Sequence, residues 1–518
     1  MRNKQNLLHA SAAAFFGAVA GAAFLSAAVL GGCAGGPSRA RPAGAQAAAK
    51  ASLAIGGPLA SGAFPKEAEL SQFAREGLAS LSTFELSNGI PVVVRKNSAS
   101  PVRHISLVLR GGSAAASLDT AGYELLALRT MARGSASHSY EEIQNLLDET
   151  SASMGALATV DYSSYSLTAL DKYFSRLLPL WADTLVAPSF KEADFDQVLS
   201  EAKLALASKE KDPWQRTALA TNSAFFEGHP YASAPEGSDE SLAAASLDKI
   251  KAWYSASFSA DRLFVVASGD FEADALRAEL EKAIGSIPDK RAGVAAKAPR
   301  FGGGGAGALV KVEHPQSRGL AYIRGDFAAP SPADGDYMAT GVAMKMFSDL
   351  LFNVVRDEHG AAYTPSSYIR SSAANYGSIV IYKTSMTNAV KRYIDEAADE
   401  FRAGKCLASE ASESEGKAPR TSIEEALPIY KAQFANEYYE KLQTNAAVAG
   451  LIAQSVVTTG DCRSWLLDGA NISAVSAEAV KAAAAKYLFG QKITWVVLGS
   501  ADTLVPVVGS DYEKLGGK

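Results

Sequence analysis

Histidine is scarce in this chain of 518 residues, and no two histidines are close neighbours. The six positions, none within five residues of another, are His9, His104, His138, His229, His314 and His359. This spacing excludes a helix that binds zinc through two imidazoles one turn apart. A zinc site elsewhere, for example at His138 with nearby acids, stays open as an alternative but has no support in the sequence.

Cysteine is rare as well, with Cys33, Cys406 and Cys462 as its only occurrences. Their spacing does not suit a zinc knuckle. In an oxidising compartment Cys406 and Cys462 can form a disulfide, and two unpaired thiols are the alternative. The sequence leaves both open.

An excess of basic charge is absent too. Lysine and arginine number 50 against 55 acidic residues, a formal net charge of -5. Without a basic patch that carries interleaved aromatic residues, this balance argues against a nucleic-acid partner. The chain is 20% charged and 48% hydrophobic, as in ordinary folded proteins, and its length suits two or more domains.

The N-terminal segment reads as a targeting signal. Arg2 and Lys4 precede a long apolar run that ends in Leu30-Gly31-Gly32-Cys33. This ending resembles a bacterial lipobox, which implies a signal peptide over 1–32 and lipidation of Cys33. An ordinary signal peptide or a membrane anchor is the alternative. Ala34 after the cysteine favours the outer membrane, so we expect a lipid-anchored, periplasm-facing protein of the bacterial cell envelope.

The segment 33–69 is rich in Ala, Gly, Pro and Ser and reads as a flexible tether. No later apolar run is long enough to span a bilayer, so the lipid anchor is the only membrane contact that we expect.

The mature chain repeats itself. Ser246–Gly269 aligns without a gap on Ser476–Gly499, at an offset of 230 residues, and each copy reads as a helix followed by a β-branched strand. Earlier in each half the offset is 214, where Arg110-Gly111 matches Arg324-Gly325. The difference implies an insertion in the second half, and the polar segment Ala408–Ser422 is the candidate.

The repeat predicts two related domains, 70–288 and 308–508, joined by a Gly-rich linker at 289–307. Strand and helix patterns alternate in each half, so the predicted class is α+β, with a mixed or antiparallel sheet in each domain and helices packed on one face. In the first half we expect a hairpin at Phe84–Lys96 and a strand at His104–Arg110. The predicted helices of this half are Gly122–Met131, Tyr140–Thr150, Tyr173–Val186 and Ala193–Lys209.

Several of these landmarks resemble one peptidase family. The motifs are LSNGIPVVV at Leu86–Val94, the Gly-Gly-Ser at Gly111–Ser113, GALATVDYSSYSL at Gly155–Leu167 and WADTLVAPSF at Trp181–Phe190. Together they are similar to the insulinase/pitrilysin-type metallopeptidases, the inverzincins, over about residues 81–504. The resemblance implies two-domain units of the predicted fold.

Active members of that family carry a His-x-x-Glu-His helix, in which both imidazoles bind zinc and the Glu is the general base. Aligned from Gly122, those three positions hold Leu125, Leu128 and Arg129. The distal ligand, a Glu in the family, falls near Ala205, with Glu201 one helical turn away. The resemblance therefore implies no catalytic residues, no metal and no cofactor in this chain.

The second half keeps a different family motif. LFNVVRDEHGAAYTPSS, from Leu351, is similar to the segment whose Arg and Tyr hydrogen-bond the substrate backbone, and these two fall on Arg356 and Tyr363. The alternative is an Arg at a helix end and a Tyr at a strand start that only pack. We interpret His359 as a surface residue, and Asp357 with Glu358 as exposed acids that form an acidic rim or are only solvated.

Some family members divide the work between two subunits, one with zinc and one that keeps only the Arg/Tyr pair. We therefore predict a non-catalytic, substrate-binding subunit of a heterodimeric zinc metallopeptidase that cleaves peptides in the cell envelope. The partner would be a zinc-bearing peptidase subunit of the same family. The alternatives are a structural or binding protein on this fold and, with the least support, a self-sufficient peptidase.

Overall fold

The structure is a computed structural model that describes residues 59–60, 64–289, 307–408 and 416–516, all within one compact unit, Leu53–Lys518. The predicted signal peptide 1–32, the lipidation site Cys33, most of the predicted tether and nearly all of the linker lie outside the described residues.

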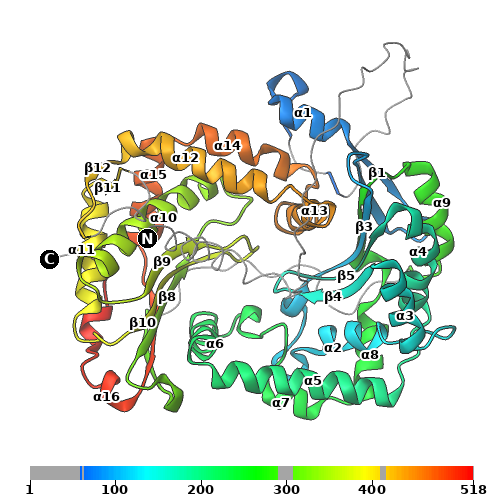
Figure 1. Cartoon of the computed structure of the whole chain (residues 1–518), viewed down its shortest axis with the longest axis horizontal. Coiled ribbons are helices and arrows are strands. Elements are labelled where there is room, and N and C mark those ends of the chain that lie inside the picture. Colours follow the sequence, from blue (N-terminus) through cyan, green and yellow to red (C-terminus); the bar gives the residue numbers. More distant parts are fainter. Residues whose placement is uncertain (1–58, 61–63, 290–306, 409–415, 517–518) are drawn as a thin grey trace, which may run out of the picture. The chain divides into compact units, whose positions relative to one another are not determined.

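The first half contains six strands and a set of helices within the described residues (Figure 1). The strands are β1 Leu81–Glu85, β2 Pro91–Lys96, β3 Val102–Arg110, β4 Ser153–Ala158, β5 Tyr162–Leu170 and β6 Leu263–Gly269. The helices are α1 Gln72–Ala79, α2 Tyr123–Met131, α3 Tyr140–Thr150, α4 Asp171–Val186, α5 Glu192–Lys211, α6 Pro213–Phe225, α7 Asp239–Ala244, α8 Leu247–Ser257 and α9 Ala273–Ile284.

The second half follows the same plan. Its strands are β7 Leu309–Glu313, β8 Ala321–Ala328, β9 Thr364–Ile369, β10 Tyr376–Thr384, β11 Lys405–Leu407, β12 Arg420–Ser422 and β13 Thr494–Gly499. Its helices are α10 Tyr337–Phe352, the π-helical segment η8 Asn353–Glu358, α11 Val390–Arg402, α12 Ile423–Glu440, α13 Asn445–Thr459, α14 Asp468–Ala474, α15 Ala477–Ala483, the π-helical segment η11 Ala484–Phe489 and α16 Ala501–Leu504.

The two main sheets have equivalent strand orders. The first runs β1-β2-β6-β3-β5-β4 and the second β7-β13-β8-β10-β9. In each sheet the repeated strand, β6 or β13, pairs parallel with one neighbour and antiparallel with the other. The predicted α+β class with mixed sheets and the duplication are therefore confirmed, and β1 is an extra edge strand of the first sheet.

The repeated helix begins in the same way in both halves. The Ser246 hydroxyl accepts a hydrogen bond from the Lys249 amide, and the Ser476 hydroxyl accepts one from the Ala479 amide. Such N-caps satisfy amide groups that the first helical turn leaves without partners. The strand that follows is fully buried in both halves, as expected for a strand inside a sheet.

Strands β3 and β8 correspond at a different offset from the predicted one. Val108 in β3 and Asp326 in β8 pair with equivalent residues of β6 and β13, which sets their offset at 218. The predicted match of Arg110 with Arg324 at 214 is therefore wrong by four residues. An even shift keeps every side chain on the same face, so the hydrophobic pattern could not reveal it.

The extra residues of the second half lie between α11 and α12. That connection spans residues 403–422, whereas its counterpart between α4 and α5 spans only residues 187–191. Two described parts of it, β11 and β12, pair antiparallel, with Cys406 opposite Thr421. The predicted insertion is therefore anchored at both ends as a small two-stranded sheet.

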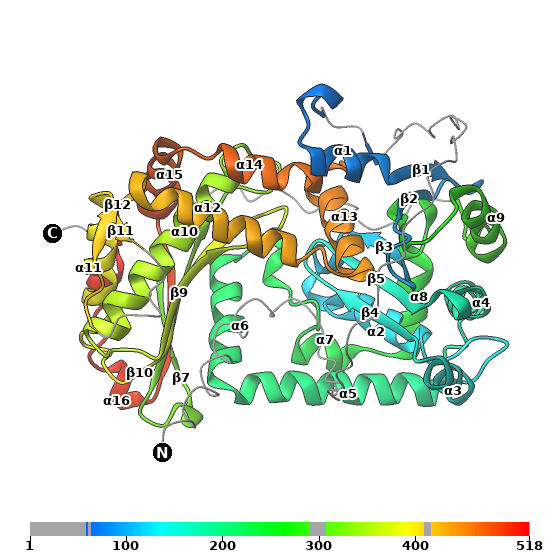
Figure 2. The same cartoon turned by 45° about the horizontal axis from the view of Figure 1, so that its top comes forward.

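Each sheet is covered on both faces, which extends the predicted one-sided packing. The helices of each half bury one face of their own sheet in a large apolar core. On the other face of the first sheet, α13 packs against β3 and β6, and it lies beside β3 in both views (Figure 1 and Figure 2). Helix α6 packs in turn against β8 and β13. Each half thus contributes one helix that covers the sheet of the other half.

One helix in the described residues, Tyr337–Glu358, is long and apolar enough to cross a membrane, contrary to the expectation from the sequence. Its most apolar window is 72% buried, and its side chains fill the core of the second half. The long apolar stretch is therefore explained by burial of this helix in the core of the second half.

Cys406 and Cys462 are free thiols in this structure. Cys406 lies in the core of the second half, whereas Cys462 lies in the cluster beneath α13. Burial raises the pKa of both thiols to about 12, so both are protonated and unreactive at neutral pH.

Candidate functional site

Helix α2 carries the positions at which the family binds zinc. It begins after Gly122, whose left-handed backbone (φ 81°) and close approach to the Glu236 carbonyl leave no room for a Cβ atom. Leu125 and Leu128 are 7% and 1% exposed, and Leu128 packs in the core of the first half. The position of the first zinc-binding histidine and that of the general base are thus buried.

The other two replaced positions face solvent. Arg129 is exposed on α2, and Ala205 is exposed on α5, as is the neighbouring Glu201. Within the described residues, no group of three or more His, Cys, Asp or Glu side chains is placed to hold a metal ion. His138 lies 3.4 Å from Asp183, without a third ligand group of that kind around them.

A buried ion pair on α2 was not predicted from the sequence. The Glu124 carboxylate lies 2.6 Å from the Arg262 guanidinium, and both side chains are almost completely buried. Burial raises the pKa of Glu124, and the charge of Arg262 opposes the rise. Arg262 also donates to the Arg110 carbonyl at 2.6 Å. The pair links α2 to the first sheet and has no access to a substrate.

Arg356 and Tyr363, the predicted substrate-binding pair, lie next to each other. Arg356 is in η8, and Tyr363 immediately precedes β9 after a turn at Gly360 (φ 59°). The Arg356 guanidinium donates to the Tyr363 carbonyl at 3.1 Å and lies over the rings of Phe352 and Tyr363, at 4.7 and 5.1 Å from their centres. Cation–π contacts of this kind fix a guanidinium without using its N–H groups.

The Tyr363 side chain points away from the core. It is 64% exposed, whereas the Tyr363 amide donates to the Lys383 carbonyl and so fixes the backbone. An exposed phenol on a fixed backbone beside a guanidinium is a pair of hydrogen-bond donors available to a ligand. Packing alone does not explain the position of this tyrosine.

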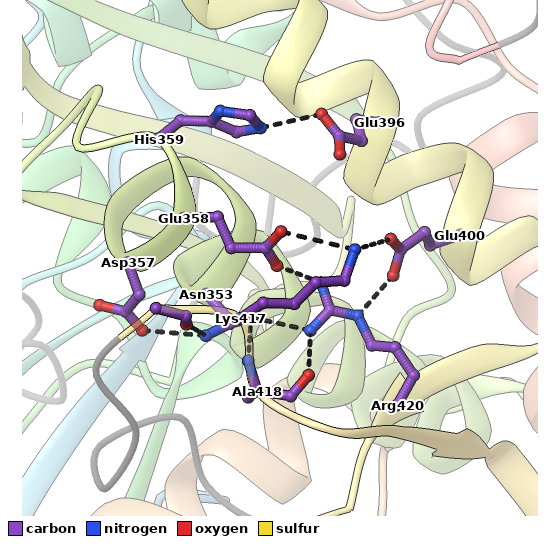
Figure 3. Close-up of polar contacts among 10 residues, drawn as sticks. Asn353, Asp357, Glu358, His359, Glu396, Glu400, Lys417, Ala418 and Arg420 are labelled. Atoms are coloured by element: carbon purple, nitrogen blue, oxygen red, sulfur yellow. Dashed lines mark hydrogen bonds and ion pairs between the residues drawn. The ribbon is translucent and has the colours of Figure 1, made fainter.

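A polar cluster that was not predicted from the sequence packs against η8 (Figure 3). Asn353 is fully buried, donates to the Gly416 carbonyl at 3.0 Å and accepts from the Ala418 amide at 3.2 Å. Arg420 lies 2.5 Å from both Glu358 and Glu400 and donates to the Asn353 side chain at 2.8 Å. Residues 416–420 belong to the insertion and lead into β12, which we call its return strand. The return strand is therefore attached to η8.

The prediction that Asp357 and Glu358 are both exposed acids is wrong for Glu358. Glu358 is not an exposed acid, because its side chain is only 10% exposed and is paired with Arg420 and, at 3.6 Å, with Lys417 (Figure 3). Asp357 accepts from the Asn353 amide group at 3.2 Å, and burial raises the pKa of its carboxyl.

His359 is not a simple surface residue either. Its ring stacks on Tyr393 at 3.8 Å between ring centres. Its Nε2 lies 3.0 Å from Glu396 (Figure 3). These contacts attach the end of η8 to α11 and direct the imidazole away from a role in ligand binding.

Fold and site together define a two-domain peptidase-like protein in which the described residues of the first half form no group of three or more metal-binding side chains. Sequence comparison agrees: residues 91–237 match the model for the insulinase family (peptidase family M16), and residues 244–405 match the model for the peptidase M16 inactive domain. The chain belongs to the insulinase family and is of its inactive type, as predicted.

Three similar proteins illustrate this placement. The non-peptidase homolog YmxG of Helicobacter pylori is 24% identical over 203 residues, which is 39% of this chain and about half (47%) of that protein. A peptidase M16 inactive domain from Pseudomonas fluorescens has a TM-score of 0.70 at 19% identity and covers 81% of this chain and 98% of its own. A protease from Helicobacter pylori has a TM-score of 0.70 at 16% identity, covering 81% and 99%. The two structures establish the shared fold.

Proposed function

We propose that this chain is a non-catalytic, substrate-binding subunit of a zinc peptidase that acts in the cell envelope. The observation that carries the proposal is the placement of Arg356 and Tyr363, two hydrogen-bond donors that lie side by side with an exposed phenol. By contrast, Leu125 at the first ligand position and Leu128 at the general-base position are buried. The zinc and the general base would come from a partner of the same family, and the lipid on Cys33 would anchor the chain.

The chemistry assigned to the pair is hydrogen bonding to the peptide backbone. Arg356 uses one N–H group on the Tyr363 carbonyl, and its remaining N–H groups and the phenol are suited to a carbonyl oxygen that gains charge during attack. The pair thus binds and polarises a peptide, and hydrolysis itself requires the metal-bound water of the partner.

A test starts from the protein in its native envelope. The chain is tagged and isolated in a mild detergent, and its stoichiometric companions are identified by mass spectrometry. The proposal expects a companion with an intact His-x-x-Glu-His helix. It also expects a fatty acid on Cys33 of this chain. Only companions without that helix, or none at all, would overturn it.

The second step uses the isolated complex and a mixture of internally quenched peptides. Arg356→Ala is expected to lower kcat/KM about 10²-fold, the usual effect of removing one donor to a developing oxyanion, without dissociating the complex. Arg176→Met is the matched control, because Arg176 forms an exposed ion pair with Glu149 in the first half. An unchanged rate in Arg356→Ala sinks the proposed role of the pair.

The second candidate is a structural or binding protein on this fold. It is favoured by the likeness to YmxG, which is named a non-peptidase homolog. On this reading Arg356→Ala leaves assembly and every measurable activity unchanged, so the same two experiments separate the candidates.

A further inference from the structure

The insertion between α11 and α12 contacts η8, the segment that holds Arg356. Its return strand brings Arg420 between the carboxylates of Glu358 in η8 and Glu400 in α11, at 2.5 Å from each (Figure 3). The side chains of all three residues are less than a fifth exposed. One guanidinium therefore joins three elements: η8, α11 and the insertion.

The same segment also satisfies the buried amide of Asn353, which begins η8. The Asn353 side chain accepts from the Ala418 amide and from Arg420 and donates to the Gly416 carbonyl. A buried amide without partners costs about 1–3 kcal/mol, so these contacts strongly favour one position of η8. Residues at both ends of η8, Asn353 and Glu358, are thus attached to the insertion, and Arg356 lies between them.

We propose that Arg420 is a positioning residue for Arg356, and hence that the insertion sets the peptide-binding geometry of the proposed function, on which this inference rests. Without the guanidinium, the exposed Lys417, 3.6 Å from Glu358 and 3.7 Å from Glu400, offsets only part of the repulsion between the two carboxylates. The end of η8 keeps its contact with α11 through His359, but the bridge through Glu358 and Glu400 is weakened. Arg356 then leaves the rings of Phe352 and Tyr363 that hold it. A displacement of about 1 Å is enough to weaken an oriented hydrogen bond severely.

The test is a double-mutant cycle between Arg420 and Arg356, because residues that act through one another are not additive. The probe is a fluorescein-labelled mixture of random decapeptides, and binding to the purified full chain is followed by fluorescence anisotropy. Arg420→Met is expected to weaken binding about 5- to 10-fold in the native background and less than about 2-fold in the Arg356→Ala background. Arg420→Lys, which keeps the charge but cannot join both carboxylates and Asn353, is expected to fall between.

Other outcomes overturn the inference in distinguishable ways. An equal loss in both backgrounds, or no loss in either, shows that Arg420 does not act through Arg356. If Arg356→Ala itself binds the probe normally, the proposed function fails and the inference with it. Arg176→Met again serves as the control for loss of an exposed ion pair.

A variant that misfolds is replaced by one that removes the repulsion. The triple variant Glu358→Gln, Glu400→Gln, Arg420→Met removes the facing carboxylates together with the guanidinium, leaves Lys417 as an exposed lysine, and lacks the same bridge. It is expected to show the same loss of peptide binding, together with faster amide exchange in residues 353–361 and unchanged exchange in β10. Normal binding by the folded triple variant would refute the positioning role.

Discussion

Helix α2 and segment η8 correspond to the two parts of a peptidase site in this family, and they have opposite surroundings. On α2, Leu125 at the first ligand position and Leu128 at the general-base position are buried, and Leu128 packs in the apolar core, whereas Arg129 at the second ligand position is exposed. Around η8, by contrast, a network of charged and amide groups holds a guanidinium next to an exposed phenol. Two positions of the zinc motif are thus buried, whereas η8 keeps polar groups around Arg356 that packing alone would not require. The burial of these two positions on α2 and the polar surroundings of η8 are therefore separate properties of this chain.

The largest effect is expected from restoring the zinc motif on α2. The triple variant Leu125→His, Leu128→Glu, Arg129→His should lose about 5 kcal/mol of unfolding free energy, because it buries an unpaired carboxylate in the core. The new Glu at 128 would also lie one turn from the buried Glu124. Urea unfolding at pH 7 and zinc analysis of the purified variant measure both consequences.

Leu125→Met is the control for this variant and should cost less than about 1.5 kcal/mol, because it keeps the apolar volume. Stoichiometric zinc in the triple variant at unchanged stability would show that α2 still holds a latent site, and would remove the contrast with η8.

A slightly smaller loss of stability is expected at the buried ion pair between Glu124 of α2 and Arg262. Arg262→Met leaves the Glu124 carboxylate buried without its partner and should cost about 3–5 kcal/mol. The double variant Glu124→Gln, Arg262→Met removes both charges and should recover part of the loss. Equal stability of the single variant and the native chain in urea unfolding would mean that Glu124 is already neutral or solvated.

The sequence predicted what depends on local periodicity. The Ser-capped helix and the buried strand after it were recognisable in both halves, as were the hairpin and the helices that follow it. These features succeed because each is encoded within a few neighbouring residues.

Features that depend on distant residues were not predictable. The cluster behind η8 joins Asn353 to Arg420, 67 residues away, and no local pattern in the sequence links the two residues. For the same reason Glu358 was taken for an exposed acid. The exchange of α6 and α13 between the halves also left no local signal, since an amphipathic helix does not specify which sheet it covers.

A pH-dependent difference is expected from His104 in β3, a polar residue enclosed in the first half. Its ring nitrogens lie 2.7 Å from the hydroxyls of Thr168 and Ser106, and burial lowers its pKa to about 4. The unfolded chain takes up this proton below about pH 6.5, so the contribution of His104 to stability is complete above that pH and is lost towards pH 4.

The expected loss attributable to His104 between pH 7 and 4.5 is about 2–3 kcal/mol. It is measured as the difference between the native chain and His104→Gln, which cannot take up a proton, in urea unfolding at the two pH values. Parallel pH profiles for the two proteins would contradict the enclosed, neutral imidazole.

The smallest effect on stability is expected at Arg356, the residue with the largest proposed effect on function. Its contacts are one hydrogen bond to the Tyr363 carbonyl and two ring faces near the surface, so Arg356→Ala should cost less than about 1 kcal/mol. The midpoint of urea unfolding reports this value. A loss as large as that at Arg262 would mean that Arg356 supports the fold in the way that α2 does. If Arg356→Ala loses almost no unfolding free energy but binds peptides poorly, the two regions have different roles. Helix α2 then serves stability, and η8 serves recognition.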